Sequence, residues 1–203
     1  MWAEADINNA LSSRLGEENF KKLKNARVAV CGLGGLGSNI AMMLCRLGIG
    51  NLLLVDFDKV DITNINRQNY YLKHIGKFKT EATREILKEI NPFTNIEIKT
   101  KRITEENAKE LLLGYDIICE AFDLPENKAM LVNTLLPLGK TLICGSGMAG
   151  YYDSNTIQTK KISDKLYICG DFISDSKDIS LMSPRVMICA AHQANMVIRI
   201  LIK

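Results

Sequence analysis

Apolar runs of four or five residues alternate with longer segments of helical periodicity along most of the chain. Each run is short enough for a buried strand, and each periodic segment is long enough for a helix. Strands that alternate with helices in this way pair in parallel through right-handed crossovers and gather ligands at their carboxyl ends. We therefore expect an α/β fold with five such strands, over residues 28–31, 52–55, 95–99, 116–120 and 140–144.

The helical segments are bounded by capping and breaking residues. Proline suits the first turn of a helix and cannot continue one. We expect one or two helices over 1–24, broken near Gly16, and further helices over 76–90, over 104–113 and from Pro125 onward. A closing helix begins at Ser183-Pro184 and faces the core, with Gln193 as its one polar interruption.

The pattern changes after residue 150. Residues 151–162 are half polar and predict extended structure, whereas residues 169–180 are rich in Asp, Ser and Gly and predict a mobile loop. The carboxyl-terminal part therefore adds a small strand segment and the closing helix to the core.

A glycine-rich loop follows the first strand, with Gly32, Gly34 and Gly37 in the spacing of a nucleotide-binding loop and Gly35 between them. The missing side chains let backbone N–H groups and a helix N-terminus meet phosphates. Asp56 ends the second strand, where a carboxylate can accept hydrogen bonds from ribose hydroxyls. Together with the strand order, this predicts a Rossmann-like, doubly wound, mostly parallel sheet that binds a nucleotide.

Two cations follow the second strand. Arg67 comes eleven residues after Asp56, and Lys79 opens the next helix, whose N-terminal amides add to the same positive field. Such a cluster suits a triphosphate better than the diphosphate bridge of a nicotinamide dinucleotide. The alternative is that both residues are ordinary surface cations.

Asp123 follows the fourth strand closely and is expected near the glycine loop. It could bind Mg²⁺ held on a triphosphate, because an acid near phosphates repels them unless a cation intervenes. The alternative is an Asp that caps the helix beginning at Pro125.

Composition narrows the class of protein. The 203 residues suit one domain, and a net charge of +3, with basic and acidic residues mixed, does not favour nucleic acid as the main partner. The N-terminus lacks a targeting pattern, and no apolar run approaches membrane-spanning length, so we expect a cytoplasmic protein without a membrane partner.

The six cysteines form no CxxC pair, and a structural zinc site needs paired thiolates at close spacing, so we expect no zinc. Cys31, Cys45, Cys119 and Cys144 are predicted to be small buried hydrophobes in a reducing compartment. The two histidines, His74 and His192, are expected to be surface or interface residues rather than catalysts.

Five motifs, in order, resemble the ThiF/MoeB adenylyltransferases, relatives of the ubiquitin-activating enzymes, and most of all the short second subfamily of ThiF proteins linked to thiamine biosynthesis. The similarity covers nearly the whole chain. The motifs are GxGGLGS at 32–38, DxDxV at 56–60, NxNRQ at 64–68, GKxK at 76–79 and the acids around Asp123. Glu120 and Leu124 stand where relatives often have Asp and Asn.

The resemblance implies ATP- and Mg²⁺-dependent adenylation of the C-terminal glycine carboxylate of a ubiquitin-like sulfur carrier such as ThiS, with pyrophosphate released. It implies that Asp56 holds the ribose, Arg67 and Lys79 bind phosphates, and Asp123 coordinates Mg²⁺. Further nucleotide-site positions implied by the motifs are the four loop glycines, Asp58, Asn64 and Gln68. Fixed cations and a metal would stabilise the charge of this transfer without a protein nucleophile.

The resemblance also implies a homodimer in which Arg14 acts as an arginine finger, in relatives supplied by the other subunit. The chain would be one domain over 1–203, with N-terminal helices over 1–24, a nucleotide-binding core over 27–145, and a carrier-docking segment and closing helix over 146–203. Cys169 is the candidate for the covalent link to the carrier that longer relatives can form, although a buried thiol is the simpler interpretation.

Three other functions would explain some of the same motif residues. A tRNA threonylcarbamoyladenosine dehydratase also adenylates a carboxylate, and the low net charge and the lack of a basic extension argue against it only mildly. An NAD-dependent oxidoreductase explains the glycine loop and Asp56 but leaves Arg67, Lys79 and Asp123 unused. A noncatalytic module would keep the nucleotide fold only as a platform for binding the carrier.

Overall fold

The computed structural model describes residues 2–203 and contains a seven-stranded sheet in the order β3-β2-β1-β4-β5-β7-β6. All neighbouring strands are parallel except β6, which pairs with β7 in antiparallel. This confirms the predicted Rossmann-like α/β fold. The strands are β1 (Arg27–Cys31), β2 (Asn51–Val55), β3 (Asn95–Lys99), β4 (Ile117–Glu120), β5 (Thr141–Gly145), β6 (Gln158–Ser163) and β7 (Leu166–Gly170).

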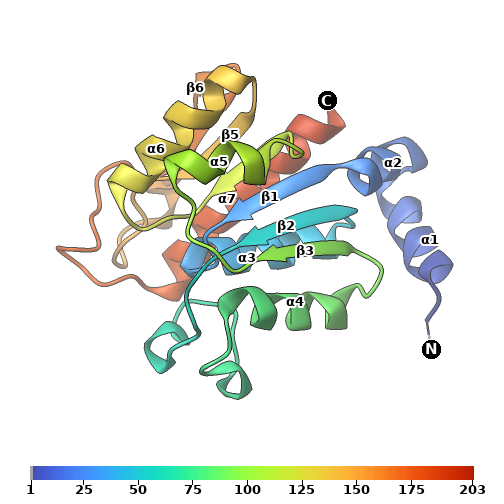
Figure 1. The fold of residues 1–203 in the computed structure, drawn as a ribbon, viewed down its shortest axis with the longest axis horizontal. Helices are drawn as coiled ribbons and strands as arrows, with labels where there is room; N and C mark the ends of the chain where they lie inside the picture. Colours follow the sequence, from blue (N-terminus) through green and yellow to red (C-terminus); the bar gives the residue numbers. More distant parts are fainter. Residues whose placement is uncertain (1) are drawn as a thin grey trace.

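Helices cover both faces of the sheet (Figure 1). One face carries α3 (Gly35–Arg46), α4 (Lys79–Ile90) and α7 (Ser183–Ile202), and the other carries α5 (Glu105–Leu112) and α6 (Pro125–Leu135). The N-terminal helices α1 (Glu4–Leu15) and α2 (Glu17–Asn25) lie beyond the amino ends of the strands. Gly16 separates them, as the sequence predicts.

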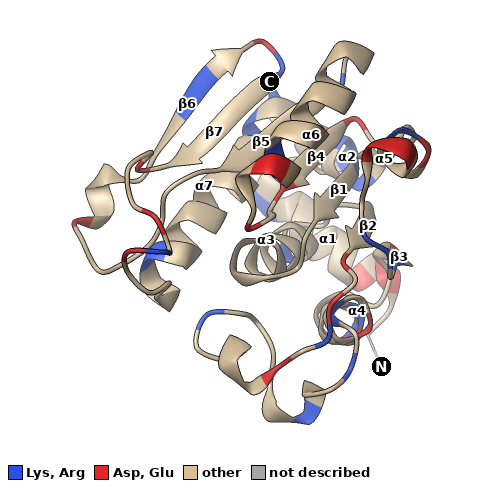
Figure 2. Cartoon of the chain, turned by 60° about the vertical axis from the view of Figure 1, so that its left-hand side comes forward, with Lys and Arg blue, Asp and Glu red and all other residues tan. Residues whose placement is uncertain are grey.

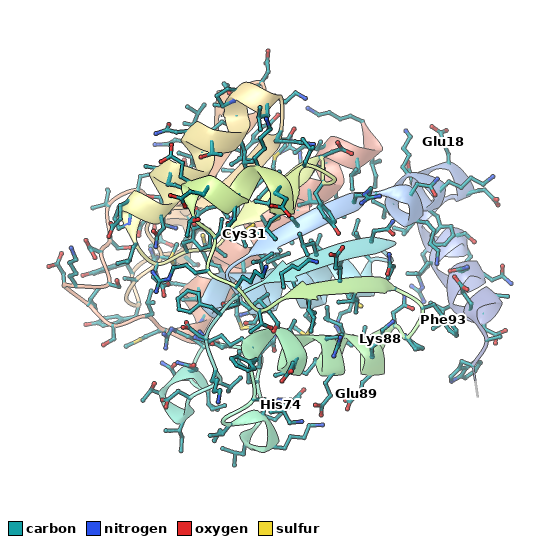
Figure 3. The ribbon with its side chains drawn as sticks, in the orientation of Figure 1. Glu18, Cys31, His74, Lys88, Glu89 and Phe93 are labelled. Atoms are coloured by element: carbon teal, nitrogen blue, oxygen red, sulfur yellow. The ribbon has the colours of Figure 1, made fainter. Side chains whose placement is uncertain are left out.

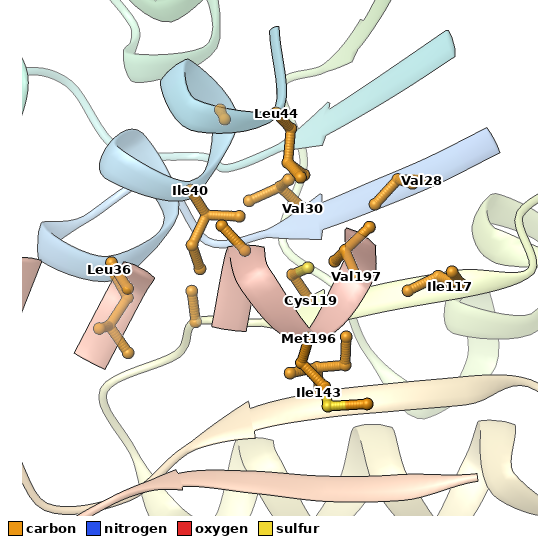
Figure 4. Packing of buried hydrophobic residues seen from close by; sticks show 14 of the residues in the cluster. Val28, Val30, Leu36, Ile40, Leu44, Ile117, Cys119, Ile143, Met196 and Val197 are labelled. Carbon is orange, nitrogen blue, oxygen red and sulfur yellow. The ribbon is translucent and has the colours of Figure 1, made fainter. Parts of the chain in front are cut away.

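Because helices cover both faces, neighbouring residues of each central strand enter different cores. In β1, Val28 and Val30 join the core beneath α3 and α7, whereas Ala29 and Cys31 join the core beneath α5 and α6. Figure 4 shows the first core, where α3 and α7 pack side chains against β1, β4 and β5. The two cores fix the sheet and so the positions of its carboxyl ends.

Residues 151–170 differ in part from the sequence prediction. The expected extended segment, 151–162, becomes strand only from Gln158, after a short turn that Asp153 caps. We did not predict β7, which lies parallel to β5 and contains Cys169. The expected loop from Cys169 was therefore placed two residues too early. A five-residue apolar run next to a hairpin turn gives too little pattern for a strand to be recognised.

The prediction that no segment is long and apolar enough to span a membrane is wrong for helix α7. The helix has 20 residues, and an 18-residue window within it has a mean hydropathy of 1.3, which meets that criterion by length and composition; no other helix among residues 2–203 does. In the fold α7 packs on α3, β5 and β7, with 44% of its apolar window buried. It is placed as a core helix, with Gln193 buried as predicted.

Charged residues of both signs are spread over the molecule in Figure 2. Basic positions on β6 and in the segment between β2 and α4 lie near acidic ones rather than in a single broad patch. The view agrees with the near balance of 26 basic and 23 acidic residues.

Candidate active site

The strand order reverses direction between β1 and β4, where loops from adjacent strands turn to opposite faces of the sheet. Doubly wound sheets bind ligands at such a point, outside the carboxyl ends of the strands. Here the glycine loop leaves β1, and a short turn over residues 121–124 leaves β4. The site is built around these two turns.

The glycine loop depends on missing side chains. Gly32 has a φ of +90°, and a Cβ there would lie 2.6 Å from the Ala121 carbonyl oxygen of the neighbouring turn. At Gly37 a Cβ would lie 1.8 Å from the Gly32 carbonyl oxygen, so only glycine lets α3 approach β1 this closely. Helix α3 begins at Gly35, and its first amides have no acceptor within the helix. These are the amides that the sequence predicts to meet phosphates.

Asp56 ties the glycine loop to the segment after β2. One carboxylate oxygen accepts the Leu33 N–H at 2.6 Å and the other accepts the Asp58 N–H at 2.7 Å. The carboxylate is buried, and burial raises its pKa, while the nearby Lys79 ammonium and the two backbone N–H donors oppose that rise. Asp56 thus orders the loop and also lines the hollow where a ribose is expected.

Lys79 is the first residue of α4, as predicted, and its ammonium lies 3.0 Å from a carboxylate oxygen of Asp58. The lysine side chain is 9% exposed and that of Asp58 is 49% exposed. Both residues line the same hollow as Asp56. The structure therefore brings together Asp56 and Asp58, which follow β2, and Lys79, which begins α4.

Two hollows flank the turn after β4. The first has a volume of about 140 Å³ and the second a volume of about 440 Å³. The first is lined by Gly32, Gly34, Asp56, Asp58, Lys79, Phe57, Arg102 and neighbours. The second is lined by Gly35, Arg67, Lys128, Val186, residues 145–149 and residues 174–176, among others. Ala121, Phe122 and Asp123 line both, so the hollows meet at this turn.

Arg67 lines the second hollow beside the start of α3. Its Nη1 donates to the Thr63 carbonyl at 3.3 Å and to Asn66 Oδ1 at 2.9 Å, whereas its Nε is buried and has no partner in the structure. A guanidinium with an unused buried donor is suited to an anion. Its position supports a ligand contact rather than an ordinary surface cation.

Gln68 and Asn64 differ in placement. Gln68 is buried next to Gly34, and its Oε1 has no hydrogen-bond partner among the described residues. Asn64 lies outside the residues that line either hollow, and its Oδ1 accepts the Asp61 N–H at 3.1 Å in a short 3₁₀ turn. In this structure Asn64 shapes the segment that carries Arg67 rather than lining a hollow.

Asp123 is exposed where the two hollows meet, and no hydrogen bond to it is found among residues 2–203. These residues also contain no cluster of three or more His, Cys, Asp or Glu side chains that could hold a metal. Mg²⁺ commonly binds through one or two carboxylates together with phosphate oxygens and water. A single free carboxylate between a ribose-sized hollow and an arginine fits such an ion.

Arg14 lies in α1, on the side of the molecule opposite the carboxyl ends of the strands (Figure 1). It is exposed and lines neither hollow. Arg14 therefore cannot reach the site of its own chain, and the structure does not bring it together with the other predicted residues.

Residues that were not predicted from the sequence hold the Arg67 segment against α3 and the glycine loop. Asn39 Nδ2 donates to the Gly35 carbonyl at 2.7 Å and to the Arg67 carbonyl at 3.2 Å. Ser38 accepts the Asn69 N–H at 3.1 Å, and Tyr70 OH donates to the Leu33 carbonyl at 2.8 Å. Only the polar residues in the first turns of a mostly apolar helix, Ser38 and Asn39, could have signalled this.

The histidine and cysteine predictions have mixed outcomes. His74, expected to be a surface or interface residue rather than a catalyst, is fully buried beside α4 (Figure 3), so the expected exposure is wrong. Its Nδ1 accepts a hydrogen bond from the Tyr71 N–H. The imidazole ring therefore stabilises the turn in the segment before α4. The cysteines predicted to be buried are buried, and Cys169 is also buried, with its pKa raised to about 11 chiefly by burial. A buried neutral thiol is a poor nucleophile.

A family model described as the ThiF family matches residues 7–203. Among curated proteins, the chain is 36% identical over 129 residues to the adenylyltransferase and sulfurtransferase UBA4 of Lodderomyces elongisporus, which covers 63% of this chain. It is 36% identical over 137 residues to the adenylyltransferase and sulfurtransferase MOCS3 of Drosophila virilis, which covers 67% of this chain. The matches span 28% and 30% of those relatives, so the chain corresponds to under a third of their length.

Among solved structures, the fold is similar to that of the E. coli tRNA N6-threonylcarbamoyladenosine dehydratase TcdA in complex with ATP. The TM-score is 0.88 with 22% identity, over 99% of this chain and 96% of that chain. It is also similar to E. coli MccB with AMPCPP and MccA, with a TM-score of 0.70 and 23% identity, over 96% of this chain and 64% of that one. At these identities the similarity concerns the fold.

Proposed function

The chain belongs to the ThiF family, and from that premise we propose that it is an ATP-dependent adenylyltransferase that activates a C-terminal carboxylate. The proposed acceptor is a ubiquitin-like sulfur carrier with a terminal glycine, such as ThiS in thiamine biosynthesis. The observation that carries the proposal is the meeting of two hollows at Asp123, with Lys79 in one and Arg67 in the other. One hollow suits the nucleoside end of ATP, and the other leaves room for an extended tail.

In the proposed reaction, a carboxylate oxygen attacks the α-phosphorus of ATP, the bond to the bridging α–β oxygen breaks, and pyrophosphate leaves. Asp56 holds the ribose, while the free amides at the start of α3 hold phosphate oxygens. Arg67 and Lys79 stabilise the charge on the transferred and leaving groups. Asp123 would bind Mg²⁺, which supplies further positive charge at the phosphates.

The second hollow suits the tail of a carrier. Glycine backbone at 145 and 147 and small or apolar side chains line much of it, whereas its charges are the cations Arg67 and Lys128 and the acids Asp123 and Asp175. A terminal glycine has no side chain to accommodate there, and its carboxylate would point toward Arg67. Residues 174–176, within the segment predicted to dock the carrier, form part of its rim.

We propose that the chain acts as a homodimer in which Arg14 of one copy reaches the site of the other. Because Arg14 lies at the far side of its own chain, it can act at phosphates only in a second copy. The proposed enzyme then has two sites, each completed by the arginine of the other subunit.

A second candidate is adenylation of a carboxylate on a modified tRNA. The similarity to TcdA extends over 96% of that chain, whereas the curated adenylyltransferase and sulfurtransferase relatives match over less than a third of their length. This difference in coverage is the observation that favours the second candidate. The spread of charge in Figure 2 favours a protein acceptor.

The test is ATP–pyrophosphate exchange by the purified chain with candidate carriers from the same genome, or with tRNA. We expect exchange with Mg²⁺ and an intact carrier, and none when the terminal glycine of the carrier is removed. Exchange that requires tRNA instead would establish the second candidate. Tight NAD binding together with no exchange for any acceptor would overturn both.

A further inference from the structure

Glu120 is a fully buried acid at the carboxyl end of β4, and no step proposed above uses it. Its carboxylate is in contact with Lys128, whose ammonium lies 3.0 Å from Oε1 and 3.3 Å from Oε2. Oε1 also accepts the Phe122 N–H at 2.6 Å. The pair therefore joins the end of β4, the turn after it and the second turn of α6.

A charge without access to water is retained only where a partner and hydrogen bonds compensate for lost hydration. Burial raises the pKa of Glu120, and Lys128 opposes that rise. The backbone carbonyl of Glu120 is also fixed, because it accepts the Gln193 Nε2–H at 2.9 Å from α7. Both the side chain and the main chain of Glu120 are thus held in place beneath the turn.

The turn above this pair is the one that lines both hollows. Phe122, whose N–H is held by Glu120, precedes Asp123 directly, and Lys128 is the fourth residue of α6, which begins two residues after Asp123. Asp123 itself makes no hydrogen bond among the described residues that could fix its position. Its backbone is held by the Phe122 N–H bond to Glu120, by the Ala121 N–H bond to the Cys31 carbonyl at 2.8 Å, and by the start of α6 at Pro125.

We propose that Glu120 and Lys128 are positioning residues, which hold the 121–123 turn so that the Asp123 carboxylate faces the point where the two hollows meet. The expected effect of this pair on catalysis rests on the proposed function, whereas its effect on the position of the turn does not. Lys128 lines the second hollow, yet its ammonium contacts both carboxylate oxygens of Glu120. Its main effect is therefore on the turn rather than on a ligand.

Side-chain length provides the test. Glu120→Asp shortens the acid by one methylene and Lys128→Arg lengthens the base, so each single change should spoil the pair and the double change should restore much of it. Glu126→Asp, the same substitution at an exposed acid of α6, the helix that carries Lys128, is the control. If Glu120→Asp fails to fold by circular dichroism, Glu120→Gln, which keeps an acceptor for Phe122, takes its place.

The first readout is hydrogen exchange of the Phe122 amide in the free protein, which needs neither ATP nor metal. We expect each single variant to exchange about 2–10-fold faster than wild type, as for one weakened hydrogen bond, and the double variant to be nearer wild type. Unchanged exchange in the single variants, or a double variant no better than the worse single one, would overturn the proposal.

The second readout is the Mg²⁺ dependence of pyrophosphate exchange. A displaced Asp123 should raise the Mg²⁺ concentration for half-maximal rate and lower kcat, with the KM for ATP nearly unchanged. A raised KM for ATP or carrier at unchanged Mg²⁺ dependence would instead show that Lys128 binds substrate directly, which contradicts the proposal. If wild type shows no exchange at all, the proposed function fails, and the amide measurement still decides the positioning role.

Discussion

At the scale of single residues, the sequence identifies well those side chains whose role is set by neighbours in the chain. The glycine spacing and Asp56 at the end of a strand predicted their observed places, and Lys79 begins a helix as expected. Residues held by distant contacts were missed. The burial of His74 and the pairing of Glu120 with Lys128 depend on elements that meet only in the folded chain.

Asp56 is expected to stabilise the fold as well as to bind ribose. Asp56→Asn leaves one acceptor oxygen for two backbone N–H groups, which should cost about 1–3 kcal/mol for the unpaired donor. Relief from burying a charge offsets part of this, because burial raises the pKa of Asp56. Urea unfolding at neutral pH measures the change. Asp61→Asn, at an exposed acid of the following turn, should have a smaller effect, and equal effects would contradict this role.

His74 should make stability depend on pH. Burial lowers its pKa, and Lys73 and Lys77 add to this, while Glu85 opposes it. The unfolded chain then binds a proton more readily than the folded one, so the free energy of unfolding falls as pH drops below the ordinary histidine value toward the lower folded value.

His74→Asn replaces the ring Nδ1 with an amide oxygen that can still accept the Tyr71 N–H, and it removes the titration. Between about pH 7.5 and about pH 5.5, wild type should lose more unfolding free energy than this variant, as measured by chemical denaturation at each pH. Parallel losses in the two proteins would show that His74 is not the cause.

At the scale of elements, helix and strand periodicity was sufficient for the parallel core and insufficient for the region after β5. The first five strands were predicted because each is an apolar or alternating run separated from the next by a helix. Strand β7 lacks such a helix before it and follows β6 through a hairpin, so its pairing with β5 is decided by the sheet already formed.

Arg185 links the segments that surround the second hollow. This buried residue of α7 pairs with Asp171 and donates to the carbonyls of Ala149 at 3.1 Å, Tyr152 at 2.9 Å and Asp153 at 2.7 Å. It therefore holds both the segment after β5 and the segment after β7 against one helix. The sequence showed only a basic residue after the helix-starting proline.

Arg185→Met should cost about 3–5 kcal/mol, because Asp171 would be left buried without its partner. Limited proteolysis should then cut residues 171–182 faster than in wild type. Arg199→Met, at an exposed position of the same helix, is the matched control and should resemble wild type in both measurements. An Arg185 variant as stable as the Arg199 variant would contradict the linking role.

At the scale of the whole molecule, the sequence pattern predicts the fold, but it does not predict whether one chain supplies every residue of the site. Ten of the eleven motif positions predicted to bind the nucleotide or Mg²⁺ lie on or beside the hollows, with Asn64 the exception, whereas Arg14 lies on the opposite side. A pattern along one chain carries no information on which residues come from a second copy.

A mixing experiment tests the proposed homodimer. Arg14→Ala and Asp123→Ala should each be inactive in carrier adenylation, since each dimer site lacks one required group. After exchange of subunits between the two variants, one site of each mixed dimer is intact, which should restore about a quarter of wild-type activity. Light scattering checks the assembly. No recovery in confirmed mixed dimers would show that Arg14 does not act across the interface.

The central claim is that this site joins AMP to a carboxylate, and intact mass spectrometry of the carrier tests it most directly. Incubated with ATP, Mg²⁺ and the wild-type chain, the carrier should gain the mass of an AMP group. It should gain none with Asp123→Ala, and Asp116→Ala, at an exposed acid before β4, should behave as wild type. An unmodified carrier with the wild-type chain, under conditions where ATP is bound, would contradict the account.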